Sequence, residues 1–478
     1  MSLGLRERAR SKTFFGGAAL LAVVASLVAC GGAGSSSSPV PGQAQSLSRA
    51  LVQSDGGQVR ARAGKIQHIV IIIQENRSFN NLFMGFPGAM TSNTGVQCDG
   101  HGNTQHVNVT AVPFEAGFDV GHGLVDFNAA YDGGKSDCFN LERYIPSPVV
   151  TPSPGPTATP LASFMYAFVP RKETRQYWAM AKKYTLGDEM FQSNIDASFT
   201  AHQYLIAGQA QNSVDIPNMQ PWGCDAPTGQ MINTITPNRQ LGPKQGVCFT
   251  YPTIATELDA AHLTWRYYAP ATSPLQLGGI WSAFDAISQV RNGPEWATNV
   301  ISPETNIIHD VQSGTLENVT WVVPDLLNSD HSGNAYQGSN GGPAWVTSVV
   351  DAIGKSQFWN STAIFVVWDD WGGWYDPQSP QYVDFDGLGY RVPLIAISPY
   401  ARLNHVAHTH YEFGSILKYI ESTWRLAPLA ASDTRAAPFG KDVFNYKQAP
   451  TPFTPFASPD EFERFSHMRP SYKVPDAD

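Results

Sequence analysis

A run of β-branched apolar residues, 69–73, gives way within two positions to Glu75, Asn76 and Arg77. Such a run predicts a strand buried on both faces, as in parallel sheets. Ligands of open α/β sheets bind beyond the carboxyl ends of the strands. The carboxylate and the amide offer hard oxygen ligands for a divalent cation, and the guanidinium fork suits an anionic oxygen. The alternative is an ordinary strand end that leads into a polar loop.

A second polar group, Asp369 and Asp370, directly follows the apolar stretch 363–368. Neighbouring carboxylates repel each other, and a bound divalent cation relieves that repulsion. Gly372 and Gly373 then allow the backbone to approach another segment closely. The pattern therefore indicates a second source of metal ligands. Taken alone, the pattern is more typical of a charged turn after a strand, in which the glycines serve the turn.

Ser198 lies four residues before His202 in the segment 196–210. If a helix begins there, the serine lies at its N-terminus and the histidine lies one turn later on the same face. Helix N-termini bind phosphate through their unpaired N–H groups. A serine in that place can attack phosphorus if a metal lowers the pKa of its hydroxyl. The alternative role is that of a simple N-cap.

Further candidate residues lie outside these segments. Asp330 and His331 can supply a metal ligand or an acid–base group. His122, Lys135 and Asp137 are polar groups in an aromatic-rich stretch, and Lys135 suits a phosphate oxygen as a point charge. Solvated surface charge is the alternative for each of them.

The elements that must position these residues alternate along the chain. Strands are predicted at 66–73, 263–268, 319–323, 363–367 and 392–397. Helices are predicted at 171–184, 251–261, 344–353 and 413–424. The alternation predicts an α/β sandwich with a mostly parallel sheet. We expect residues 64–478 to form one catalytic domain, with a proline-rich extended insert at residues 144–160.

The N-terminus has the features of a signal peptide. A basic segment precedes an apolar one, and residues 1–29 end directly before Cys30 in a pattern that resembles a bacterial lipobox. We therefore expect cleavage before Cys30, lipid attachment to its thiol, and a Gly/Ser-rich tether over residues 30–63. A plain secretory signal is the alternative. Either way, we expect the protein to leave the cytoplasm for the cell envelope.

Composition narrows the chemistry further. The net charge of −9 argues against a general nucleic-acid-binding protein, and no specific nucleic-acid binding is expected. Four cysteines follow Cys30, which suggests two disulfides in an exported chain. Three pairings are possible, and sequence proximity favours Cys98–Cys138 and Cys224–Cys248. A zinc site is the alternative, although no CxxC spacing supports it.

Several motifs in this order resemble one family. Residues 75–83 read ENRSFNNLF, residues 369–376 read DDWGGWYD, and Arg391-Val392-Pro393 precedes a Ser-Pro-Tyr. The chain thus resembles the bacterial phosphoesterases that include acid phosphatases and phosphatidylcholine-type phospholipases C. The resemblance implies a three-layer, alkaline-phosphatase-like α/β/α sandwich with a metal at the strand ends. It also implies a hydroxyl nucleophile that forms a covalent phospho-enzyme.

The resemblance assigns a role to each candidate residue. The implied metal ligands are Glu75, Asn76, Asp369 and Asp370, and the implied nucleophile is Ser198. The implied candidates for substrate contact or leaving-group protonation are His122, His202 and His331. Separately, the expected substrate-binding residues are Lys135, Asp137 and His408. Arg77 is expected to orient its motif through hydrogen bonds. Pro377 stands where family members commonly carry histidine, which argues for one metal ion rather than two.

The segment SFTAHQ, residues 198–203, is nearer to the acid-phosphatase branch than to the phospholipase branch. The predicted activity is therefore metal-dependent hydrolysis of phosphomonoesters through a phosphoserine. Cleavage of phospholipid head groups in the manner of phospholipase C is the first alternative. An inactive surface lipoprotein that binds a phospho-ligand is the second. The expected partners are a small phosphoester and, through the lipid anchor alone, a membrane.

Overall fold

A computed structural model of the chain describes residues 64–146, 163–217, 220–273, 276–277, 279–332, 341–429 and 431–473. The predicted signal, Cys30 and the tether lie outside these residues. All described residues belong to one compact unit that spans residues 60–478. In the described part of the chain, no helix has the length and apolar character needed to cross a membrane.

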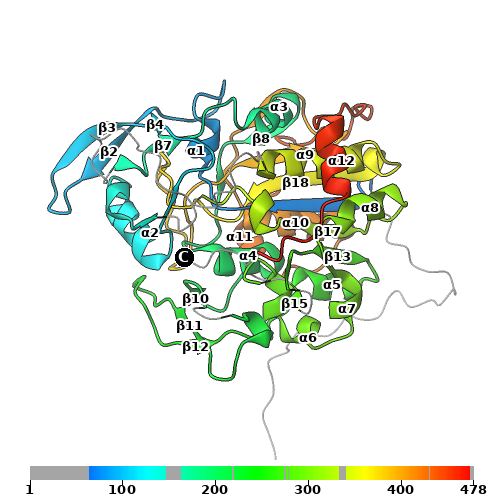
Figure 1. Ribbon diagram of the computed structural model, residues 1–478, viewed down its shortest axis with the longest axis horizontal. Coiled ribbons are helices and arrows are strands. Elements are labelled where there is room, and N and C mark those ends of the chain that lie inside the picture. Colours follow the sequence, from blue (N-terminus) through cyan, green and yellow to red (C-terminus); the bar gives the residue numbers. More distant parts are fainter. Residues whose placement is uncertain are drawn as a thin grey trace, which may run out of the picture. The chain divides into compact units, whose positions relative to one another are not determined.

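The core of this unit is an eight-stranded sheet, whose strands lie one below another near the centre of Figure 1. Its strand order is β16 (Val300–Ile301), β13 (Trp265–Tyr268), β17 (Val319–Val322), β1 (His68–Gln74), β18 (Thr362–Trp368), β19 (Leu394–Ile397), β8 (Thr185–Gly187) and β20 (His405–Ala407). Every neighbouring pair is parallel except the two pairs that β19 makes with β18 and β8. The mostly parallel sheet predicted from the sequence is confirmed.

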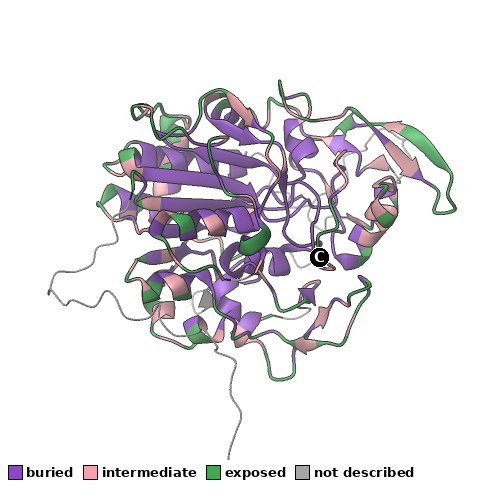
Figure 2. Ribbon diagram, turned by 180° about the vertical axis from the view of Figure 1, so that it is seen from behind, coloured by how far each residue is buried: buried purple, intermediate pink, exposed green. Residues whose placement is uncertain are grey.

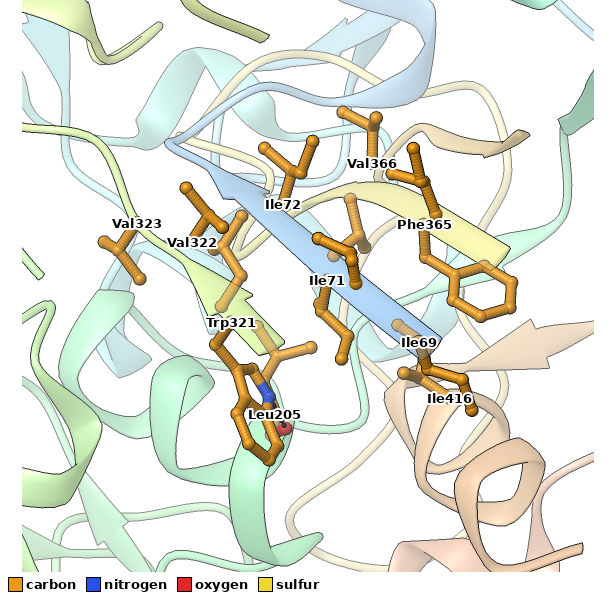
Figure 3. Packing of buried hydrophobic residues seen from close by; sticks show 14 of the residues in the cluster. Ile69, Ile71, Ile72, Leu205, Trp321, Val322, Val323, Phe365, Val366 and Ile416 are labelled. Carbon is orange, nitrogen blue, oxygen red and sulfur yellow. Dashed lines mark hydrogen bonds between the residues drawn. The ribbon is translucent and has the colours of Figure 1, made fainter. Parts of the chain in front are cut away.

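Strand β1 lies in the middle of the sheet, between β17 and β18. Ile69 is level with Val319 on one side and with Ala363 on the other. Ile71 and Ile72 pack among the apolar side chains of both neighbouring strands (Figure 3). Because β1 is covered on both faces, its sequence is continuously apolar rather than alternating. The predicted strand 66–73 was therefore placed correctly to within two residues.

Helices cover both faces of the sheet. On one face, Leu205 of α4 (Ser198–Ala207) and Ile416 of α10 (Phe413–Trp424) point toward the strands (Figure 3). On the other face lie α3 (Arg175–Lys183), α9 (Gly341–Gly354) and α12 (Pro459–Ser466) (Figure 1). Figure 2 shows most of the central strands in purple, the colour of buried residues. The predicted three-layer α/β/α arrangement is thus observed.

A second, smaller apolar cluster lies beside the carboxyl ends of the strands. It includes Phe127 from α2 (Leu124–Tyr131) and Trp371, Trp374 and Tyr390 from the long connection between β18 and β19. Its aromatic side chains pack around the segments that follow the strand ends. This cluster therefore fixes the loops that carry the candidate site.

Two disulfides, Cys98–Cys138 and Cys224–Cys248, form in the pairing that sequence proximity favoured. The first links the hairpin of β2 (Thr94–Cys98) and β3 (Thr104–Asn108) to the chain after α2. They exclude the zinc alternative for these cysteines.

The predicted proline-rich insert begins later than expected. Residues Tyr144–Pro146 form β6, which pairs antiparallel with β5 (Phe118–Val120). A tyrosine and an isoleucine that can pack against a neighbouring strand outweigh the proline that ends the segment. The rest of the insert lies outside the described residues.

Candidate metal centre and nucleophile

Parallel pairing brings the two acidic motifs together. Gln74, the last residue of β1, is level with Trp368, the last residue of β18. The next residues, Glu75 and Asp369, therefore leave the sheet side by side. The backbone N–H of Asn76 donates to Asp369 Oδ1 over 3.0 Å, which joins the motifs directly.

The close approach of the motifs depends on a glycine. Asn76 has a positive φ of 56°, and Gly372 has one of 62°. A Cβ on Gly372 would overlap the carbonyl group of Asn76. The expectation that this glycine allows close backbone contact is therefore confirmed, and the contact is with the first motif.

One half of the site combines two carboxylates with an imidazole. His202 Nε2 lies 3.0 Å from Glu75 Oε1 and 3.6 Å from Asp369 Oδ2. Ligand atoms of all three residues lie within 4.8 Å of one another, a spacing suited to one metal ion. All three side chains are fully buried. We therefore place His202 beside the predicted metal ligands, not where it could reach a leaving group.

The other half contains the predicted nucleophile. Ser198 Oγ donates to Asp370 Oδ2 over 3.1 Å, and Asn76 Nδ2 lies 3.4 Å from each of these oxygens. Ser198 is the first residue of α4, whereas Ala197 is the N-cap and supplies no side-chain hydrogen bond. The serine hydroxyl is therefore not consumed by capping and is held at a helix N-terminus beside Asp370.

The electrostatics of the site call for a cation. Burial, together with the neighbouring Asp369, raises the pKa of the Glu75 and Asp370 carboxyls well above their usual range. Burial also lowers the pKa of His202 to about 4, so this imidazole is neutral near pH 7. Among the described ion pairs, these three carboxylates are joined only to histidines.

Three oxygen atoms of the site are available to coordinate such a cation. Glu75 Oε2, Asn76 Oδ1 and Asp369 Oδ2 are buried and have no hydrogen-bond partner. Unpaired buried oxygens are costly, and coordination of a divalent cation would satisfy all of them. The residues present therefore fit the metal ion that the sequence predicted.

Two further histidines border the site. His122 Nδ1 lies 2.7 Å from the carbonyl oxygen of Val120, and its Nε2 lies 2.7 Å from Asn76 Nδ2. His331 Nδ1 lies 2.7 Å from the carbonyl oxygen of Ser332. Because a carbonyl only accepts, Nδ1 of each ring carries a hydrogen and donates it to that carbonyl. The centroids of the two rings lie 6.3 Å apart.

Arg77 is part of the framework, as the resemblance implied. It is fully buried, and its guanidinium donates to the Asp330 and Phe114 carbonyl oxygens and to Asn81 Oδ1. Burial lowers its pKa to about 10. Its donors are used by the protein, so Arg77 does not serve as a phosphate clamp in this arrangement.

The structure does not bring the other three predicted substrate-binding residues into this cluster. Lys135 is exposed and forms an ion pair of 2.5 Å with Asp132, and Asp137 lies in the same surface segment. His408 follows β20 and lies 2.9 Å from Asp188. Strand β20 is three inter-strand spacings from β18, or about 14 Å. Sequence order alone could not show this separation.

Other residues that shape the site gave no sequence signal. Gln74 and Trp368 hold neighbouring loops through their side chains, yet each reads as part of an apolar strand. Their partners lie far along the chain. The role of His202 beside Glu75 could have been suspected from its position one helical turn after Ser198.

The sequence of this cluster also matches a described family. Residues 66–427 match the family model of the phosphoesterase family. The chain belongs to this family. The match contains every residue of the cluster, and it makes the protein a phosphoester hydrolase by family.

Individual relatives carry more specific names. The chain is 24% identical over 411 residues to phospholipase C A of Mycobacterium tuberculosis, covering 75% of this chain and 72% of that one. It is 25% identical over 444 residues to phospholipase C B of that organism, covering 82% and 80%. It is 24% identical over 468 residues to the hemolytic phospholipase C of Pseudomonas aeruginosa, covering 80% and 58%.

Among solved structures, the chain is similar to a protein of the alkaline phosphatase superfamily from Vibrio parahaemolyticus. The TM-score is 0.36 at 9% identity, covering 80% of this chain and 72% of that one. The two disulfides fit an exported phosphoesterase, because such bonds persist in oxidising compartments.

Proposed function

We propose that this phosphoesterase is a metal-dependent hydrolase of phosphomonoesters that uses Ser198 as its nucleophile. One observation carries the proposal: the Ser198 hydroxyl, at a helix N-terminus, donates to Asp370 next to buried oxygens that lack partners. A nucleophilic hydroxyl, a site for positive charge and free helix N–H groups are the requirements for phosphoryl transfer.

The metal ligands in this proposal are Glu75, Asn76, Asp369 and Asp370, joined by His202. When bound, a divalent cation there supplies positive charge to the phosphoryl oxygens and lowers the pKa of the Ser198 hydroxyl. The mixture of carboxylate, amide and imidazole donors suits a first-row transition metal or zinc better than calcium or magnesium, because imidazole is a softer ligand.

The remaining chemistry belongs to residues of the chain. Ser198 Oγ forms a bond to phosphorus as its proton passes to Asp370 Oδ2, and the bond from phosphorus to the alcohol oxygen breaks. His331, carrying a proton on each ring nitrogen at this stage, donates its Nε2 proton to the departing alcohol and becomes neutral. In the second step His331 removes a proton from water, whose oxygen attacks phosphorus and releases Ser198, which recovers its proton from Asp370.

The segment SFTAHQ around Ser198 supports the choice of a monoester substrate. A second candidate is a phosphodiester of the phospholipase C type. It is favoured by the names of relatives that align with three quarters or more of this chain.

Replacement of the nucleophile tests the proposed mechanism. Ser198→Ala is expected to lower turnover of phosphoesters by about 10³-fold or more while bound metal, measured by elemental analysis, stays unchanged. Ser348→Ala is the matched control, because Ser348 is a buried serine of α9 whose Oγ donates to Ala344. Turnover near the wild-type rate in Ser198→Ala would rule out this nucleophile.

A substrate panel tests the substrate class. The kcat/KM values for p-nitrophenyl phosphate, bis-p-nitrophenyl phosphate and phosphatidylcholine vesicles are compared, using the metal-loaded protein. We expect the monoester to give the highest value. A higher value for phosphatidylcholine would select the phospholipase candidate. Metal binding without hydrolysis of any substrate would instead indicate a phospho-ligand-binding protein.

A further inference from the structure

The backbone of Asp330, the residue before His331, contacts the two residues that flank Glu75 and Asn76. Its N–H donates to Gln74 Oε1 over 3.0 Å, and its carbonyl oxygen accepts from Arg77 Nε over 2.7 Å. Gln74 and Arg77 are the residues directly before Glu75 and directly after Asn76. Two hydrogen bonds to Asp330 therefore hold the chain on either side of the proposed metal ligands Glu75 and Asn76.

The side chain of Asp330 reaches the second motif. Its Oδ2 accepts from Trp368 Nε1 over 2.9 Å, and Trp368 directly precedes Asp369. Its Oδ1 accepts from the Tyr177 hydroxyl over 3.0 Å. Tyr177 and Trp368 also pack edge to face, with ring centroids 5.0 Å apart. Both carboxylate oxygens are therefore used by the protein.

A further hydrogen bond from Gln74 also holds the loop that contains Asp330. Gln74 Nε2 donates to the carbonyl oxygen of Asn328 over 3.1 Å, so both ends of the Gln74 amide hold the loop that contains Asp330. The side chains of Gln74, Arg77, Tyr177, Trp368 and Asp330 are all buried. Hydrogen bonds in such a dry environment are strong and costly to leave unmade.

We propose that Asp330 is a positioning residue. It sets the distance between the ligand pair Glu75/Asn76 and the ligand pair Asp369/Asp370, and it holds His331 beside them. It touches segments adjacent to both pairs, and it is covalently joined to His331. No described contact links its side chain to Glu75, Asp369 or Ser198, so Asp330 acts through its neighbours. The proposal deepens the proposed function and rests on the metal site assigned there.

The role assigned to Asp330 requires hydrogen bonds rather than a negative charge. Asparagine can preserve both side-chain contacts, because its oxygen can accept from Trp368 while its amide donates to the Tyr177 oxygen. Alanine preserves neither. A general base or a metal ligand at this position would not tolerate either change, so the two variants separate the roles.

The experiment compares Asp330→Ala with Asp330→Asn by titrating Mn²⁺ into metal-free protein and measuring free Mn²⁺ by electron paramagnetic resonance. We expect the Kd for Mn²⁺ to rise about 10- to 100-fold in Asp330→Ala, as when other partners of metal ligands are lost. Asp330→Asn should restore the Kd to within about threefold of the wild type, and kcat should follow the same order with little change in KM.

Two further variants keep the test decisive. Asp351→Ala removes a buried aspartate of α9 that binds Phe456 N and Lys355, and it should leave the Kd unchanged. If Asp330→Ala does not fold, Trp368→Phe removes one contact alone and should raise the Kd by a smaller factor.

The proposal is overturned if Asp330→Ala, or Trp368→Phe in its place, binds Mn²⁺ like the wild type. It is also overturned if Asp330→Asn is as impaired as Asp330→Ala. Because the readout is metal affinity, it remains informative even if Ser198→Ala shows that the proposed nucleophile is wrong.

Discussion

At the scale of single residues, three histidines near one site have different surroundings. His202 is fully buried against Glu75 and Asp369. His122 contacts the Asn76 amide instead, and His331 binds the carbonyl oxygen of Ser332 through Nδ1. The sequence could not separate them, because all three are histidines in polar segments. Their contacts decide which one is suited to hold metal and which to transfer protons.

This division predicts opposite results for two substitutions. His202→Gln should lower the bound metal measured by elemental analysis, because it removes the nitrogen next to Glu75. His331→Gln should retain the metal and lower kcat by about 10²- to 10⁴-fold, since it removes the proposed general acid. Full metal content in His202→Gln, or full kcat in His331→Gln, would contradict the respective role.

At the scale of elements, the site exists because β1 and β18 are parallel and in register. The sequence located both strands and their polar ends, so Glu75, Asn76, Asp369 and Asp370 could all be predicted. It raised a helix beginning at Ser198 only as a condition, and the structure shows that helix as α4. What it lacked was the strand order, which separates His408 on the edge strand from the centre and leaves Lys135 on the surface.

The first disulfide is an element-scale constraint that can be tested. It closes a segment with a sequence separation of 40 around the hairpin β2–β3 and α2. The double variant Cys98→Ser/Cys138→Ser should lose about 3–4 kcal/mol of unfolding free energy, because the unfolded chain regains the entropy that the bond removed. Urea denaturation measures this loss, and dithiothreitol should lower wild-type stability while leaving that of the double variant less affected. An unchanged urea midpoint in the double variant would contradict the expectation.

At the scale of the whole molecule, several acidic groups are buried away from the site. Burial raises the pKa of Asp386 to about 6, and its Oδ2 accepts a short hydrogen bond from the Tyr204 hydroxyl. Burial also raises the pKa of Glu421 to about 7. In the unfolded chain such carboxyls lose their protons near pH 4. The folded protein therefore binds more protons than the unfolded chain between about pH 4 and 6.

The sign of the resulting pH dependence follows from this difference. The contribution of Asp386 to stability is greatest below pH 4 and is lost as the pH rises through about 6. The loss amounts to about 3 kcal/mol for a shift of this size.

Asp386→Asn should therefore lose less unfolding free energy than the wild type between pH 4.5 and 7.5, measured by urea denaturation. The exposed Asp460→Asn is the control and should follow the wild type. Parallel pH curves for the wild type and Asp386→Asn would contradict a raised pKa at Asp386.

The sequence by itself located five strands of the central sheet, four helices and the residues with catalytic potential, because apolar periodicity and motif spacing are local properties. It did not predict the short strands β8, β16 and β20. It also indicated the disulfide pairing, since close cysteines pair readily. Only the tertiary structure decided that Glu75 and Asp369 are neighbours, that His202 joins them, and that Asp330 is tied to both. These relations depend on strand order and register between segments that lie from 38 to 293 residues apart, which no local pattern encodes.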